Sequence, residues 1–159
     1  MAIERITEFY AKDHDELDWF LKQFQAFKRQ DFDKAKPFFR SFKFGLQRHI
    51  LWEEEILFPV FESKTGMKDS SPTAVMRHEH ILIKEALEDL HGKVREHDPD
   101  SDIEEKTLID ILSQHNLKEE SMLYPAIDKI TSDQEKKELF DQMRALPEAR
   151  YGRCECHGH

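Results

Sequence analysis

The sequence predicts an all-α protein: an up-down-up-down four-helix bundle with a pseudo-two-fold internal repeat, followed by a short C-terminal helix and a tail. Apolar residues recur at helical spacing in four long segments, without sustained alternation of period two. These segments have comparable lengths and short connections, which is typical of such bundles. A repeat with a step of 66 residues takes His14, His49 and Glu53 to His80, His115 and Glu119. The repeat predicts an approximate two-fold axis through the core.

The first two predicted helices make up the first half of the bundle. One runs from about residue 3 to residue 28 and carries His14 on its apolar stripe. The other spans roughly residues 34 to 62 and carries His49 and Glu53 on its apolar face. Because these two residues are four positions apart, their side chains stack on one side of the helix.

The third predicted helix begins with Ser71 as its N-cap and Pro72 at its first helical position. Its apolar stripe contains His80, and it ends at Asp98 and Pro99. We therefore expect the first and third helices to turn their histidines toward each other.

The fourth predicted helix opens with a capping box formed by Ser101 and Glu104. This helix carries His115 and Glu119 one turn apart on the face that points to the core. The inward positions on either side of them are Leu108, Leu112, Met122 and Ala126. A second capping box, Ser132 with Glu135, opens the short fifth helix, which ends near Leu146.

The composition fits one compact domain, which we place at residues 1–146, with a tail at 147–159. The chain has 159 residues, a formal net charge of −9 and a pI near 5.5. It therefore lacks the basic face that nucleic acids require and the polybasic segment that anionic membranes attract. Ions, small molecules or a protein of unknown kind are the expected partners.

No apolar run approaches the roughly 20 residues of a membrane-spanning helix, and the first residues lack a secretory hydrophobic segment. We therefore expect a cytoplasmic location.

The tail concentrates Cys154, Cys156, His157 and His159 within six residues. Two cysteines so close to one end cannot staple the fold, which excludes the disulfide-scaffold class. Two interpretations stay open. The tail either chelates zinc, nickel or copper(I), or acts as a thiol redox element; alternatively, it is a mobile polar end.

The repeated residues have the chemistry of a metal site. Neutral imidazole binds iron, zinc or copper, and a carboxylate can span two metals, so four histidines and two glutamates suit a dinuclear centre. A single histidine on an apolar stripe is more often a hydrogen-bonded core residue. Burying two carboxylates together with four imidazoles, however, costs several kcal/mol per unpaired charge, which a metal pair offsets.

Both copies of the pattern extend into the motif H-x-L-x-E-E-x-x-L-aromatic-P, at residues 49–59 and 115–125. With Asp13-His14 and Glu79-His80, this motif resembles the hemerythrin-like (HHE) domain over about residues 1 to 130. The resemblance implies two non-haem iron ions bridged by carboxylates, with O₂ binding at an open iron position. By position, it makes His14, His49, His80 and His115 the terminal ligands, and Glu53 and Glu119 the bridges.

Two departures separate this sequence from the oxygen-carrying members of the family. Lys84 stands where those proteins have a second histidine on the third helix, and the fourth helix has H-x-x-x-E where they have H-x-x-x-x-D. The resulting set is similar to the bacterial iron-centre repair proteins and to the iron-sensing hemerythrin domain of an F-box protein. Fewer histidines leave more open coordination positions. Zinc or another divalent metal stays possible.

Several neighbours are weighed as accessory residues. His78 is about 200° around the helix from His80 and is expected to point elsewhere. Glu54 and Glu120 are expected either to lie in solvent or to hydrogen-bond a side chain that ligates the metal. Asp13 and Glu79 could accept a ring N–H, although an exposed helix surface is the plainer expectation for them.

His91 and His97 are expected on the surface near the end of the third helix. Tyr10 and Trp19 could pack beside the site, although ordinary core positions are the plainer expectation for them.

The sequence leaves three interpretations of the function open. The favoured one is a module that binds or senses O₂, or senses iron. The alternative is a di-iron stress-response protein that acts on NO or peroxide, or donates iron for iron-sulfur centre repair. A structural bundle that binds zinc adventitiously is a third interpretation. The order His before Glu disfavours ferritin-like carboxylate sites, which use Glu-x-x-His. We favour a binding module over a turnover enzyme mainly because metal binding is what the residues indicate directly. The sequence also lacks the nucleophile and base spacing of a hydrolase.

Overall fold

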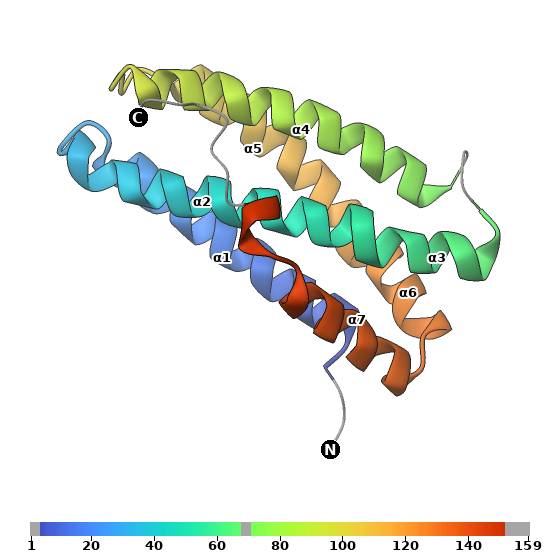
Figure 1. Cartoon of the computed structure of the whole chain (residues 1–159). Helices are drawn as coiled ribbons and strands as arrows, with labels where there is room; N and C mark the ends of the chain where they lie inside the picture. The colour runs from blue at the N-terminus through green and yellow to red at the C-terminus, as the bar shows by residue number, and fades with distance from the viewer. Residues whose placement is uncertain (1–3, 68–70, 152–159) are drawn as a thin grey trace.

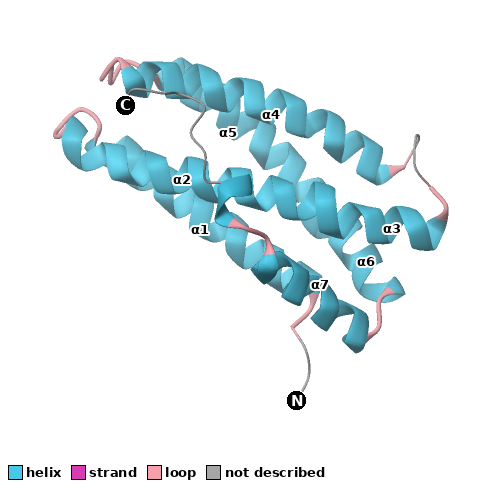
Figure 2. Ribbon diagram, in the orientation of Figure 1, coloured by secondary structure: helices cyan, strands magenta, loops and turns pink. Residues whose placement is uncertain are grey.

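The computed structural model describes residues 4–67 and 71–151, and none of these residues lies in a strand (Figures 1 and 2). The α-helices are α1 (Ile6–Phe27), α2 (Phe32–Trp52), α3 (Phe58–Thr65), α4 (Pro72–Arg95), α5 (Asp102–Lys118), α6 (Tyr124–Ile130) and α7 (Asp133–Ala145). Two π-helical turns, η1 (Glu53–Leu57) and η2 (Glu119–Leu123), and a 3₁₀ turn, η3 (Glu148–Arg150), complete the set. The predicted all-α bundle is confirmed.

The π turns join shorter helices into long ones. The segments α2, η1 and α3 run on without a break, as do α5, η2 and α6, so the bundle has the four long helices that the sequence predicts. Helix α1 packs against α2 and α6, α4 packs against α5, and α7 contacts η1 (Figure 1). No helix in the described part of the chain is long and apolar enough to span a bilayer.

Each π turn begins at one of the repeated glutamates. The N–H of Phe58 bonds to the carbonyl of Glu53, and the N–H of Tyr124 bonds to that of Glu119. In both copies a proline without an N–H follows, at Pro59 and Pro125. A π turn accommodates one extra residue, so it moves the inward face along by one position.

This shift overturns one predicted core residue. Met122, which a straight α-helix would turn inward, is 68% exposed, whereas Leu123 and Tyr124 are buried. Each turn therefore re-aims the residues that follow the metal-ligand motif.

The helix starts agree with the sequence in two of three cases. Ser71 caps α4 by accepting from the N–H of Ala74, and Ser132 with Glu135 forms the expected capping box of α7. The predicted box at Ser101 and Glu104 is wrong, because Ser101 makes no side-chain cap. Its hydroxyl instead donates to Glu105, a buried carboxylate that also binds Lys28.

The core consists of two apolar clusters with a polar layer between them. On α1, Tyr10 belongs to one cluster and Leu17 to the other, with His14 in between. On α4, His80 lies between Met76 and Ile83 in the same way. The histidines therefore lie in a polar layer of the bundle interior, with apolar side chains packed on both sides of it.

Trp19 does not belong to this core. It is 52% exposed, and its ring meets the edges of Phe20 and Phe38. Tyr10, by contrast, is fully buried, as expected.

The first residues of the tail fold back along the bundle. The ring of Tyr151 packs edge-on against Phe44 of α2, and Arg150 pairs with Glu55. The remainder of the tail, with Cys154, Cys156, His157 and His159, lies outside the described residues.

Candidate metal centre

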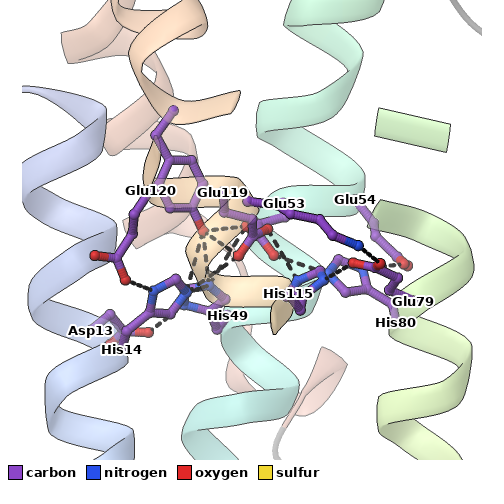
Figure 3. A network of polar contacts seen from close by, with 12 residues as sticks. Asp13, His14, His49, Glu53, Glu54, Glu79, His80, His115, Glu119 and Glu120 are labelled. Atoms are coloured by element: carbon purple, nitrogen blue, oxygen red, sulfur yellow. Dashed lines mark hydrogen bonds and ion pairs between the residues drawn. The ribbon is translucent and has the colours of Figure 1, made fainter. Parts of the chain in front are cut away.

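All six residues singled out by the repeat meet in the bundle interior, and all six are buried (Figure 3). Their donor atoms fall into two overlapping groups, each with all its atoms within 4.8 Å of one another. One group consists of Glu53, His80, His115 and Glu119, and the other of His14, His49 and Glu119. The pseudo-two-fold repeat therefore becomes two adjacent clusters that share a glutamate.

The spacing of the donor atoms matches a coordination shell. Bonds of about 2.0–2.2 Å to a metal place neighbouring ligand atoms about 3.0–3.5 Å apart. The observed separations are 3.1 Å for His14 Nε2–His49 Nε2, 3.1 Å for His80 Nε2–Glu53 Oε1, 3.3 Å for His14 Nε2–Glu119 Oε1 and 3.3 Å for His115 Nε2–Glu119 Oε2. The Nε2 atoms and carboxylate oxygens thus already stand where a cation pair would hold them.

Every histidine of the cluster hydrogen-bonds a carboxylate through its other nitrogen, Nδ1 (Figure 3). These contacts are His14 with Glu120 at 2.7 Å, His49 with Asp13 at 2.7 Å, His80 with Glu54 at 2.7 Å and His115 with Glu79 at 2.9 Å. A carboxylate at Nδ1 keeps the proton on that nitrogen, so Nε2 presents its lone pair to the interior.

These contacts decide the role of the acidic neighbours. Glu54 and Glu120 support ligand rings, one of the two positions expected for them. Asp13 and Glu79 were expected on an exposed helix surface, and that expectation is wrong: Asp13 is buried, and both bind a histidine. Each stands directly before a histidine on one helix and reaches the histidine of the neighbouring helix, a placement that becomes visible only when the helices pack.

Tyr124 is a buried polar residue of the site that sequence reasoning missed. Its hydroxyl donates to Glu53 Oε2 at 2.5 Å and lies 2.8 Å from Glu119 Oε1. In the other half, the equivalent Phe58 stacks its ring on His80 at 5.7 Å between centroids. The aromatic position of the repeated motif, Phe in one copy and Tyr in the other, was the available signal.

The electrostatics favour positive charge within the cluster. Burial alone lowers the pKa of His49, but the charge of Glu53 and the hydrogen bond with Asp13 outweigh it and raise the pKa to about 10. Burial likewise opposes protonation of His80, yet hydrogen bonds to its carboxylate neighbours raise its pKa to about 9. Without a metal, protons therefore neutralise the two buried glutamates.

The pKa values of Glu53 and Tyr124 are shifted as well. Burial raises the pKa of Glu53, but the charge of His49 and hydrogen bonds from the cluster hold it well below its usual value. Burial and the two glutamate charges raise the pKa of Tyr124 well above its ordinary range, so its phenol keeps its proton in the metal-free protein.

The residues present fit a metal pair. Glu119 Oε2 is buried and accepts no hydrogen bond within the described part of the chain, although an unsatisfied buried carboxylate oxygen is costly. A cation between His115 and this oxygen would satisfy it. Mixed imidazole and carboxylate donors suit iron and zinc better than magnesium or calcium.

The sequence profile of the hemerythrin HHE cation-binding domain matches residues 5–127. The chain belongs to the hemerythrin family. An uncharacterised hemerythrin-like protein of Schizosaccharomyces pombe is 30% identical over 133 residues, which cover 82% of this chain and 63% of that protein. The chain thus spans somewhat less than two thirds of that relative's length. No solved structure matches it significantly. The family and the clustered histidines and glutamates together indicate a cation-binding protein.

The other candidate residues of this hemerythrin-like chain lie away from the cluster. His78 is exposed on α4, as its position around the helix predicts. His97 is exposed as well, but His91 is buried, and its Nδ1 lies 2.7 Å from the Lys43 ammonium. The expectation of a surface position for His91 is therefore wrong. Lys84 approaches Glu54 at 3.9 Å.

A cavity of about 190 Å³ adjoins the hemerythrin cluster between α1 and α5. Side chains of three candidate ligands, His14, His49 and His115, form part of its wall. Apolar residues from four helices line most of the remainder, including Leu21, Phe42, Leu46, Ile83 and Leu112. Exposed acidic residues, Asp15 and Asp18, also border it. A small molecule in this cavity would touch the imidazole side of the cluster.

Proposed function

We propose that this hemerythrin-like chain holds two iron ions and binds O₂ at an open iron position. The proposed ligands are His14, His49, Glu53, His80, His115 and Glu119. The observation that carries the proposal is the convergence of four inward Nε2 atoms and two carboxylates at coordination-shell spacing. Family membership supports cation binding, and the choice of iron rests on the donor set and on the resemblance.

In this proposal the candidate ligands form two metal positions. His80 and His115 serve one position, His14 and His49 serve the other, and Glu119 lies within reach of both groups. The carboxylates on the four Nδ1 atoms fix the ring orientations. When bound, ferrous iron supplies the electrons for reversible O₂ binding.

The cavity supports a small, neutral ligand. Half of its lining residues are apolar, so a charged guest would lose hydration that these side chains do not replace. Asp15 and Asp18 at its border repel anions. Neither the loss of hydration nor the acidic border opposes an apolar diatomic molecule. We therefore infer that O₂ reaches the metal through this cavity between α1 and α5.

The deciding experiment is anaerobic reconstitution with Fe(II), followed by metal quantitation and absorption spectra on adding and then removing O₂. We expect two irons per chain and a visible band that appears with O₂ and disappears on its removal. Irreversible oxidation would contradict the O₂-binding function and favour reactive chemistry with peroxide or NO. Failure to retain iron under conditions where zinc is retained would overturn the assignment of iron.

A further inference from the structure

The two halves of the site differ at the aromatic position of the repeated motif. Under the 66-residue repeat, Tyr124 corresponds to Phe58, whereas the six candidate ligands repeat as His with His and Glu with Glu. Tyr124 is fully buried and turns its hydroxyl toward the cluster, whereas Phe58 offers only a ring face to His80. The hydroxyl of Tyr124 therefore has no counterpart at the equivalent position of the other half.

The surroundings of that oxygen are those of a metal ligand. Tyr124 Oη lies 2.5 Å from Glu53 Oε2, 2.8 Å from Glu119 Oε1, 3.3 Å from His49 Nε2 and 3.4 Å from His14 Nε2. Metal binding requires these four atoms to present lone pairs. Tyr124 Oη lies about as far from these four atoms as they lie from one another, so a cation held between His14 and His49 would also be within reach of the phenol oxygen.

The donor counts point the same way. The group around His80 already has four donors from histidine and glutamate, whereas the group around His14 has three. Glu53 Oε2 borders the smaller group at 3.6 Å from His49 Nε2, and Tyr124 Oη, 2.5 Å from that oxygen, would add a further donor there. The larger group faces Phe58, where no such oxygen is available.

We propose that Tyr124 is a direct ligand of the metal held by His14 and His49, so that the two metal positions are chemically different. This inference rests on the proposed metal pair. Ligation breaks the phenol O–H bond, forms a bond from oxygen to metal and releases the proton to solvent; no electron is transferred. The charge of the metal drives the deprotonation, as it does for other protein ligands.

The test uses the full-length protein loaded with iron and oxidised to Fe(III), in three forms: wild type, Tyr124→Phe and Tyr10→Phe. Tyr10 is the matched control because it is also fully buried, and its ring stacks on Tyr124 at 4.8 Å. Its hydroxyl faces Met143 Sδ at 3.6 Å instead of the donor atoms. The readouts are phenolate-to-Fe(III) charge-transfer absorption, resonance Raman bands of a bound phenolate and iron per chain.

We expect the phenolate bands in the wild type and in Tyr10→Phe, and their loss in Tyr124→Phe. One of the two irons should also bind at least about tenfold more weakly in Tyr124→Phe, because the smaller group loses a donor. Two bound irons without phenolate bands in the wild type would overturn the inference and leave the metal pair standing. Bands that persist in Tyr124→Phe would overturn it as well. Failure of all three proteins to bind iron would instead refute the proposed function, and with it the premise of the inference.

Discussion

His14 Nε2 and His49 Nε2 lie 3.1 Å apart in the bundle interior, with the two rings held from the neighbouring helices α1 and α2. Each ring commits its Nδ1 to a carboxylate, Glu120 for His14 and Asp13 for His49. Neutral rings in this arrangement would oppose two lone pairs. A metal ion accepts both lone pairs at once, and in its absence a proton takes that place. The contact therefore couples metal binding to proton release.

Removal of one candidate ligand should abolish tight metal binding at its position. We expect His80→Ala to weaken the affinity of at least one metal by more than about 100-fold, beyond the effect usual for outer partners of a ligand. His78→Ala is the matched control, because His78 is exposed on the same helix. Metal titration by calorimetry checks this. Equal affinities in the two variants would exclude His80 from the site.

The carboxylates on Nδ1 should also affect metal affinity. Glu79→Gln keeps the size of the side chain but weakens its hydrogen bond with His115, which orients that ring. A loss of about 10- to 100-fold in affinity is expected. Glu85→Gln, an exposed position on the same helix, should bind metal like the wild type. An unchanged affinity in Glu79→Gln would show that ring orientation does not depend on this contact.

The metal-free protein should lose stability as the pH rises. The folded-state pKa values of His49 and His80, about 10 and about 9, lie above the value of about 6.5 for an unfolded histidine. Their stabilisation is therefore complete below about pH 6.5 and is lost as the pH rises through about 9 to 10. The check is Tm in the presence of a chelator from about pH 6 to about pH 10.

The double variant His49→Gln/His80→Gln is the control for this pH series. Its Tm should vary less over the same range, because both raised pKa values are gone. If the metal-free wild type is equally stable at both ends of the range, protons do not replace the metal in the cluster.

Filling the cavity should slow ligand entry without displacing metal. Leu112→Phe adds volume to the wall between α1 and α5, so O₂ should associate more slowly at unchanged metal content, because close-packed side chains must move to admit it. Leu117→Phe, at a 62% exposed position on the same helix, serves as the control. Stopped-flow absorption measures both rates. Identical rates would place the entry route elsewhere.

The buried lysine at the far end of the bundle should be essential for stability. Lys28 pairs with Glu105, which is only 2% exposed. Lys28→Met leaves that carboxylate without its counter-charge, so we expect a loss of about 3–5 kcal/mol in the free energy of unfolding. Lys22→Met, which breaks an exposed pair with Asp18, should cost less than about 1 kcal/mol. Urea unfolding distinguishes the two cases.

The sequence predicts the bundle and the convergence of the repeated residues because both depend on periodicity. Apolar stripes place the helices, and the common 66-residue step brings the repeated His and Glu residues together in the interior. The histidines of α1 and α4 belong to different groups, because His14 lies beside His49 and His80 lies with His115. The capping box at Ser132 is predictable for a similar reason, since it depends on residues three positions apart. The box predicted at Ser101 fails because packing brings Glu105 and Lys28 to that hydroxyl, so local chemistry of this kind is predictable only where no neighbouring helix competes.

Features that depend on neighbouring helices were less predictable. Asp13 looked like a surface residue because its partner, His49, comes from another helix. Met122 was placed inward because the α-helical period does not anticipate a π turn. Tyr124 combines both difficulties: η2 re-aims it, and its hydroxyl meets residues from three other segments.

The carboxylate contacts also show how the two halves of the chain are interleaved. Glu120 of the second half supports His14 of the first, and Glu54 of the first supports His80 of the second. Glu119 reaches across in the same manner to the first-half histidines. Each group of candidate metal ligands therefore needs residues from both halves of the chain. Two identical copies of the first half, paired about a two-fold axis, would place Glu54 of each copy beside His14 of the other, which is the arrangement expected if the gene arose by fusion of a symmetric homodimer's two subunits.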